Sequence, residues 1–343
     1  MFEITAIQAN QGDALLLSYG AADQLRHILI DGGMAESVDN VLAVLKAARK
    51  NGTLRLEVLV VTHYDLDHIE GIIALLQQKP DWLEIGDVWF NGKKHLQPVD
   101  VLGHAEGETL TQLIEEGNLP WNHAFGGACI SSDWLDPIDL PGGMTAWILS
   151  PDEKRLQNLA NEWVGPTPPA DDEVEQAPDL LGKNDAWPID TNANYPDENF
   201  RADSATPNGS SIAIMFEYDN QKALLTGDAF ANVVADGLEK HWELPVNVNV
   251  LKVSHHGSKG NTNPRLLQSI DCSRFLISTS GAQHKHPDQA LIAKIMRSCP
   301  GAEFIFNYAQ PQTTGWQNAP ADWPPHKLTF PVVGKPYVKV KLP

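Results

Sequence analysis

The segment Thr62-His63-Tyr64-Asp65-Leu66-Asp67-His68 decides the fold, because it places four potential metal ligands within six residues. It directly follows the run Val58–Val61, which is apolar and typical of a buried strand. Imidazole nitrogens and carboxylate oxygens suit divalent ions such as Zn²⁺, Mn²⁺ or Fe²⁺. A loop that turns at the end of a strand can direct His63 and Asp65 at one ion, and Asp67 and His68 at another.

A purely structural interpretation is that Asp67 only caps a helix beginning near Ile69. This interpretation is the weaker one, because two histidines and two aspartates at the end of an apolar strand are costly to pack without partners. The sequence therefore predicts a metal site at this position.

Three further polar clusters also follow predicted strands. They are Thr226-Gly227-Asp228, Ser254-His255-His256-Gly257-Ser258-Lys259 and His284-Lys285-His286-Pro287. Asp228 has the placement of a bridging carboxylate, whose two oxygens can hold two cations. Each cluster taken alone is more often structural, since Gly-Asp marks turns and histidine pairs are usually surface or core residues. Together they share one position and one ligand chemistry, which favours a joint site.

This set resembles the metallo-β-lactamase superfamily. The motifs that carry the resemblance are HxDxDH (His63, Asp65, Asp67, His68), TGD (Thr226–Asp228), SHHGS (Ser254–Ser258) and HP (His286-Pro287). Three further segments are similar to the ComEC-like branch, the family of the nuclease-like domain of DNA-uptake proteins: Gln11-Gly12-Asp13-Ala14, Ile30-Asp31-Gly32-Gly33 and Asn208-Gly209-Ser210-Ser211. The resemblance spans about residues 2–287, with 155–207 unmatched.

The resemblance implies an α/β fold, a four-layer αββα sandwich with a dinuclear site along one edge. One ion would take His63 and Asp65, and the other would take Asp67 and His68. Asp228 would bridge the two ions, and one of the two adjacent histidines would complete the second. Because neighbouring residues of an extended chain point in opposite directions, we expect His255 to be the ligand and His256 to line the pocket.

The chain departs from the superfamily pattern at one ligand. Many members supply a further histidine to the first ion, between the first motif and the TGD aspartate. No histidine occurs near the corresponding segment 147–151, and His95, His104 and His123 lie upstream without a ligand-like context. The first ion is therefore expected to be ligand-poor, weakly held or completed by water.

The expected cofactors are two divalent ions, Zn or Mn, which activate a hydroxide and clamp the oxygens of a displacement at phosphorus. We expect Asp67, His256, His286 and Lys259 to act in catalysis. His286 could protonate a leaving oxygen, since imidazole titrates near neutral pH. Lys259 and Lys285 could add positive charge at the rim, or be plain solvated residues. The predicted activity is that of a metal-dependent phosphodiesterase or nuclease-like hydrolase.

The charge limits the substrate. The chain has 25 basic and 44 acidic side chains, a formal charge of −19. Because nucleic-acid affinity comes mostly from Lys and Arg displacing counterions, this charge excludes binding through a broad basic face. A nucleotide or small phosphodiester fits more easily than DNA, which would need a basic partner or segregation of the charge onto the insertion.

Two other functions stay open. One is hydrolysis of a lactone, thioester or β-lactam at the same metal centre. The other is a binding or effector module with a compromised site, which the missing histidine favours. A comparison of activity on a chromogenic phosphodiester and on a lactone distinguishes a phosphodiesterase from a hydrolase of lactones, thioesters or β-lactams. Metal content distinguishes an enzyme from a binding or effector module.

The predicted organisation is one hydrolase domain over residues 1–300 and a C-terminal extension over 301–343 that packs on it. Residues 155–207 are rich in proline and acidic residues and are expected to form an irregular insertion, either a lid or a docking surface for a protein partner. Its aromatic residues, Trp163, Trp187 and Tyr195, could stack on a ligand or anchor the loop.

Helices are expected at 38–48, 69–77, 229–244, 264–268 and 289–297, and a hairpin across Asp219-Asn220. No apolar run of membrane-spanning length and no leader pattern occurs, so we expect a cytoplasmic protein with no membrane segment. Cys129, Cys272 and Cys299 show no pairing pattern and are expected to be buried hydrophobes.

Overall fold

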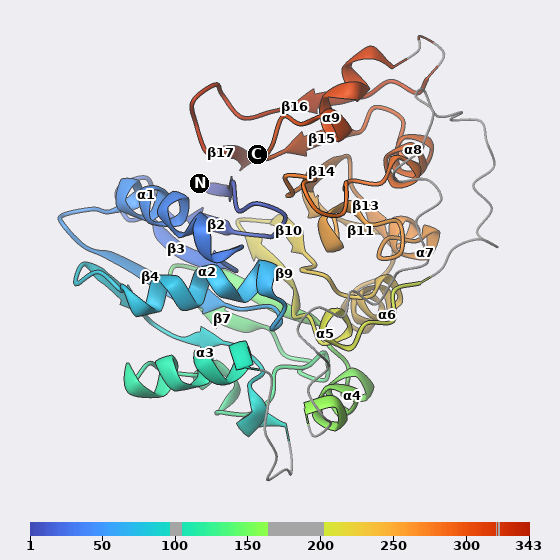
Figure 1. The fold of residues 1–343 in the computed structure, drawn as a ribbon. Coiled ribbons are helices and arrows are strands. Elements are labelled where there is room, and N and C mark those ends of the chain that lie inside the picture. The colour runs from blue at the N-terminus through green and yellow to red at the C-terminus, as the bar shows by residue number, and fades with distance from the viewer. Residues whose placement is uncertain (97–104, 164–201, 320, 322) are drawn as a thin grey trace.

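The computed structural model describes residues 1–96, 105–163, 202–319, 321 and 323–343. Two β-sheets stack face to face and helices cover their outer faces (Figure 1). One apolar cluster fills the space between the sheets, and two others fill the spaces between each sheet and its helices. These three cores define four layers, helix, sheet, sheet, helix, as the sequence predicted.

The first sheet has the strand order β17-β1-β2-β3-β4-β5, with β6 also paired to β4. Its strands are β1 (Phe2–Ile7), β2 (Leu15–Tyr19), β3 (Arg26–Ile30), β4 (Leu54–Val60), β5 (Leu83–Ile85), β6 (Val88–Trp89) and β17 (Tyr337–Leu342). Helices α1 (Val38–Ala48), α2 (Leu66–Gln77) and α3 (Ala105–Glu116) contribute buried residues to the core on its outer face.

The second sheet has the order β16-β15-β14-β12-β10-β9-β8-β7. Its strands are β7 (Ile138–Leu140), β8 (Met144–Ser150), β9 (Ala213–Tyr218), β10 (Gln221–Leu225), β12 (Val250–Lys252), β14 (Arg274–Ile277), β15 (Glu303–Phe306) and β16 (Lys327–Thr329). Helices α6 (Ala231–His241), α7 (Pro264–Gln268) and α8 (Gln289–Ser298) pack against it, while β11 (Val246–Asn247) and β13 (Ile270–Asp271) form a separate pair. The remaining helices are α4 (Glu153–Trp163), α5 (Thr206–Gly209) and α9 (Pro311–Thr314).

Strand direction places the candidate site. Strands β10, β12 and β14 are parallel neighbours, so their carboxyl ends, and the loops after them, meet at one edge of the second sheet. Strands β3 and β4 are likewise parallel in the first sheet. The polar segments that follow these strands are therefore brought together from distant parts of the sequence.

Several predicted elements need correction. The expectation of an irregular insertion is wrong at residues 155–163, because Leu156, Leu159 and Ala160 form an apolar face that packs α4 against the first-sheet core. Residues 164–201 of the insertion, with Trp187 and Tyr195, lie outside the described residues. The expected lid or docking surface in this part of the insertion therefore stays a prediction. Helix α2 begins at Leu66 rather than near Ile69, with Asp65 at its N-cap and Asp67 inside its first turn. Asp67 is therefore not the cap.

Other expectations are confirmed. Helices α1 and α7 have the predicted bounds, and β9 and β10 pair across Asp219-Asn220, both of which have positive φ angles. The expected helix 229–244 is shorter, as α6. Cys272 is buried, Cys129 and Cys299 are half-buried, and all three are free.

The C-terminal segment contributes to both sheets. Strands β15 and β16 extend the second sheet, and β17 pairs with β1 in the first. The division of the chain at residue 300 stays a prediction. Within the described part of the chain, no helix has the length and apolar character needed to cross a bilayer.

Candidate metal centre

Close backbone contacts fix the position of the HxDxDH motif. The amino end of α2 lies against the loop between β1 and β2, where a Cβ at Gly12 would come within 1.6 Å of the carbonyl oxygen of Asp67. A Cβ at Gly71 would come within 1.9 Å of the carbonyl oxygen of Gly32, just after β3. Only glycine permits these approaches, which bring Asp67 and His68 to the sheet edge.

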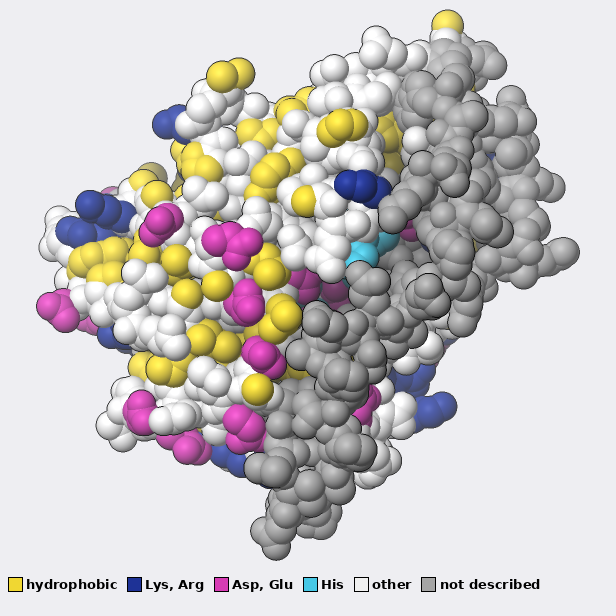
Figure 2. All heavy atoms as spheres, viewed as in Figure 1, with side chains coloured by type: hydrophobic (Ala, Val, Ile, Leu, Met, Phe, Trp, Pro, Cys, Tyr) yellow, Lys and Arg dark blue, Asp and Glu magenta, His cyan; other side chains and the backbone are white. Residues whose placement is uncertain are grey.

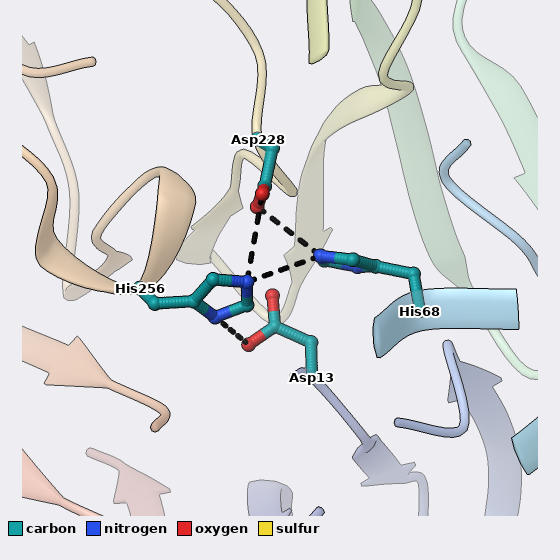
Figure 3. Close-up of side chains that lie close together, drawn as sticks. All are labelled: Asp13, His68, Asp228 and His256. Atoms are coloured by element: carbon teal, nitrogen blue, oxygen red, sulfur yellow. Dashed lines mark hydrogen bonds and ion pairs between the residues drawn. The ribbon is translucent and has the colours of Figure 1, made fainter. Parts of the chain in front are cut away.

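Four buried side chains from four separate segments form the centre of the site (Figure 3). They are Asp13, His68, Asp228 and His256, and one ligand atom from each lies within 4.8 Å of the others. The Nε2 atom of His68 lies 3.4 Å from Asp228 Oδ1, and that of His256 lies 3.5 Å from Asp228 Oδ2. The two Nε2 atoms are 3.2 Å apart. Asp228 therefore stands opposite both imidazoles.

The other residues of the first motif surround this group. Asp67 Oδ2 lies 3.2 Å from His256 Nε2, and Asp67 Oδ1 lies 3.9 Å from His68 Nε2. His63 is buried beside His68, with ring centroids 4.2 Å apart, and its Nε2 atom lies 3.4 Å from Asp65 Oδ2. Asp67 thus faces the His68–His256 side, and Asp65 faces His63.

Both adjacent histidines turn toward Asp228. The expectation that one of them points away is wrong, because the chain there is not extended: His255 and His256 have φ angles of 49° and 55°. The Nε2 atom of His255 lies 3.8 Å from Asp228 Oδ2. His255 is more exposed than His256, with 16% against 4% of the side chain accessible.

Each of the three histidines that face Asp228 has an acceptor at Nδ1. His68 contacts Asp31 Oδ2 at 2.8 Å, and His256 contacts the carbonyl oxygen of Ser278 at 2.9 Å. For His255 the partners are Asn261 Oδ1 at 2.9 Å and Asp203 Oδ2 at 3.3 Å. A proton held at Nδ1 leaves the Nε2 lone pair directed into the site, which is how proteins orient metal-ligating histidines.

Charge is concentrated in this group. Burial would raise the pKa of Asp228, but His256, His68 and His255 outweigh it and hold that pKa well below the usual range. Burial would lower the pKa of His255, but Asp228 and Asp203 raise it to about 9. Asp228 likewise raises the pKa of His68 and of His256 well above that of a free imidazole.

The residues present fit divalent ions. His63 Nε2 and Asp228 Oδ1 are buried and have no hydrogen-bond partner among the described residues. Buried polar atoms without partners are costly, and a cation would satisfy them. The donors are nitrogen and oxygen without sulfur, which suits Zn²⁺, Mn²⁺ or Fe²⁺.

Metal binding is expected to release protons at pH 7, because the pKa values of His68, His255 and His256 are raised and imidazole ligates in its neutral form. Apparent metal affinity should therefore weaken as the pH falls. Without metal, the raised pKa of His255 stabilises the fold below pH 6.5, and this contribution is lost as the pH rises through about 9. Calorimetry of Mn²⁺ binding in buffers of different ionisation enthalpy measures the protons, and a binding enthalpy independent of the buffer would contradict the expectation.

The other residues predicted for the site, His286, Lys259 and Lys285, lie outside the central group. His286 Nδ1 lies 3.3 Å from Asp288 Oδ1, and its ring centroid is 5.8 Å from that of His255. The backbone N–H of Lys259 donates to Asp288. Lys285 is exposed and donates to the carbonyl oxygen of Ala282. Figure 2 shows histidine side chains reaching the surface of the face in view, with acidic side chains next to them.

The upstream histidines do not join the centre where the structure describes them. His95 packs edge-on against Trp121, with ring centroids 4.6 Å apart, and burial lowers its pKa to about 4. His123 is exposed, and His104 lies outside the described residues. Sequence reasoning assigned no role to Asp13, Asp31, Asp203 or Lys252, all of which contact the central residues.

Comparisons with known proteins found one curated relative with a local match and several similar solved structures. The curated ComE operon protein 3 of Bacillus subtilis (strain 168) is 32% identical over 103 residues, which cover 28% of this chain and only 12% of that protein. This local likeness fits the resemblance to the ComEC-like branch. No protein-family model matches the chain.

Similar solved structures include the metallo-β-lactamase fold protein YhfI from Bacillus subtilis, with 12% identity, a TM-score of 0.47 and coverage of 99% of this chain and 98% of that one. The short form of human tRNase Z has 10% identity, a TM-score of 0.42 and coverage of 99% of both chains. In the present structure, the HxDxDH, TGD and SHHGS motifs meet at one edge of a four-layer αββα sandwich. The chain has the metallo-β-lactamase fold. Within that fold, the centre described here lies at the sheet edge where the resemblance places it.

Proposed function

We propose that this metallo-β-lactamase-fold chain is a metal-dependent hydrolase that cleaves phosphodiesters at a centre for two divalent ions, Zn or Mn. The observation that carries the proposal is the convergence of three imidazole Nε2 atoms on the two oxygens of Asp228, at 3.4, 3.5 and 3.8 Å. Buried imidazoles that each have a partner at Nδ1 and direct Nε2 at one carboxylate support a cation site over a packed core.

The residues that would hold the ions follow from these contacts. His63 and Asp65 would hold one ion, and Asp67 and His68 the other, with Asp228 shared between them. The sequence favoured His255 over His256 as the further ligand. The proposal includes both, because both Nε2 atoms face Asp228 and His256 is the nearer and the more buried.

Two divalent ions would supply activated water near neutral pH and positive charge for displacement at phosphorus. The chain's own residues would orient the substrate at the rim. His286, whose Nδ1 atom faces Asp288, would hold a proton near the leaving oxygen, and Lys259 would contribute positive charge. The formal charge of −19 favours a nucleotide or small phosphodiester over long DNA. A cytoplasmic location stays part of this proposal.

Metal content and turnover of bis-p-nitrophenyl phosphate, measured on the same samples, test the proposal. We expect about two equivalents of metal and turnover that chelator abolishes and Zn²⁺ or Mn²⁺ restores. A chromogenic lactone serves as the second substrate. Turnover of the lactone alone would replace the phosphodiesterase by a hydrolase of lactones or related acyl substrates. No metal and no turnover after reconstitution would leave a binding module.

A further inference from the structure

Lys252 is a buried cation next to the proposed metal centre. It is the last residue of β12, and its side chain is fully buried. Its Nζ atom donates to the carbonyl oxygen of Gly227 at 3.1 Å, forms an ion pair with Asp13 Oδ2, and lies 3.8 Å from Asp228 Oδ1. Burial would lower the pKa of Lys252, but Asp13 and Asp228 outweigh it and raise it, so the ammonium group stays charged.

Asp13 has a ligand atom close enough to join a metal site, yet its surroundings assign it another task. One oxygen is paired with Lys252. The other lies 3.5 Å from Nδ1 of His256, on the side of the ring away from the Nε2 atom that faces Asp228. Asp13 therefore lies on the Nδ1 side of the His256 ring, whose Nδ1 atom contacts the carbonyl oxygen of Ser278 at 2.9 Å (Figure 3).

Lys252 is the compensating charge of Asp13, because solvent has little access to that carboxylate. The space beside Asp13 is a cavity of about 10 Å³, lined in part by Asp31, Thr62 and Gly227. It holds one water molecule at most.

The charge of the whole group agrees with this role. Oxygens of six aspartates lie within 4 Å of a nitrogen of His63, His68, His255 or His256: Asp13, Asp31, Asp65, Asp67, Asp203 and Asp228. Two divalent ions would carry four positive charges, and the pairing with Lys252 removes the charge of Asp13 from those that the ions must balance.

We propose that Lys252 is a positioning residue that tunes the affinity of the centre for divalent ions: its ammonium group cancels the charge of Asp13 and keeps that carboxylate behind His256, outside the ligand set. The inference rests on the proposed metal centre.

Two single variants and their combination test it, with Zn²⁺ affinity measured by competition against a fluorescent chelator. Lys252→Met removes the positive charge, so Kd should fall at least about tenfold. Asp13→Asn leaves the Lys252 ammonium group without its paired carboxylate beside the ions, so Kd should rise at least about tenfold. In the double variant the charges are again balanced, and Kd should lie at least about tenfold below that of Asp13→Asn.

The pattern separates tuning from a merely structural ion pair, whose loss would weaken binding in both single variants. That result, or a double variant no tighter than Asp13→Asn, would overturn the inference. If Lys252→Met does not fold, the comparison of the double variant with Asp13→Asn still decides. Lys222→Met is the matched control, because Lys222 pairs with Glu217 on β9 and β10 and should leave Kd unchanged. A wild-type chain that binds no metal would instead refute the proposed function.

Discussion

Asp228→Asn is expected to lower turnover of bis-p-nitrophenyl phosphate at least about 10³-fold and to remove most of the bound metal. The substitution keeps the size of the side chain but replaces one carboxylate oxygen by an NH₂ group, whose nitrogen atom cannot serve as a ligand. It also removes the negative charge that faces the Nε2 atoms of His68, His255 and His256. Metal content by elemental analysis and initial rates on the same sample measure both effects.

Asp219→Asn is the matched control. Asp219 is exposed in the turn between β9 and β10, before the strand that leads to Asp228, and its φ angle of 52° suits asparagine as well as aspartate. It should retain wild-type metal content and rate. Two equivalents of metal in Asp228→Asn would show that this carboxylate is not shared between ions, and an unchanged rate would place the reaction elsewhere.

The ligand clusters were predictable because their signal is local. An apolar strand that ends abruptly in His and Asp is visible in the sequence around His63 and around Asp228. The rule that parallel strands share a carboxyl edge then brings such loops together without knowledge of the coordinates. The four layers were expected from the resemblance of these motifs to the metallo-β-lactamase superfamily, and not from the order of strands and helices alone.

The supporting residues were not predictable in the same way. Asp13 lies in a segment that supported the resemblance without a role of its own, and its ion pair joins the loop between β1 and β2 of the first sheet to Lys252 on β12 of the second. One signal was present: Lys252 interrupts the apolar run Val250–Val253, and a lysine inside a buried strand requires a buried partner. The sequence does not say which carboxylate that partner is.

Two other errors have physical causes. The helix α4 was missed because its apolar face of Leu156, Leu159 and Ala160 is short and adjoins a long acidic, proline-rich segment, whose composition dominated the interpretation. The directions of His255 and His256 were missed because positive φ angles are uncommon outside glycine. Tertiary contacts impose that conformation here, including the Nδ1 partners of both rings.

His256→Gln is expected to weaken metal binding about 100-fold or more, and His255→Gln only about tenfold. His256 is almost fully buried, and its Nε2 atom lies within 3.5 Å of Asp228, His68 and Asp67 alike. The Nε2 atom of His255 lies farther from Asp228, at 3.8 Å, and belongs to a partly exposed ring. Competition against a chelator gives both affinities.

His123→Gln is the control, since His123 is exposed in a turn away from the centre and should bind metal as the wild type does. The ranking of the two variants decides between two assignments. A larger loss in His255→Gln would support the preference for His255 that the sequence suggested. Equal losses of about 100-fold would mean that both imidazoles bind with the same strength and that burial of the ring adds nothing. A larger loss of metal affinity in His256→Gln than in His255→Gln is expected if the contribution of each histidine depends on how many other ligand atoms lie close to its Nε2 atom.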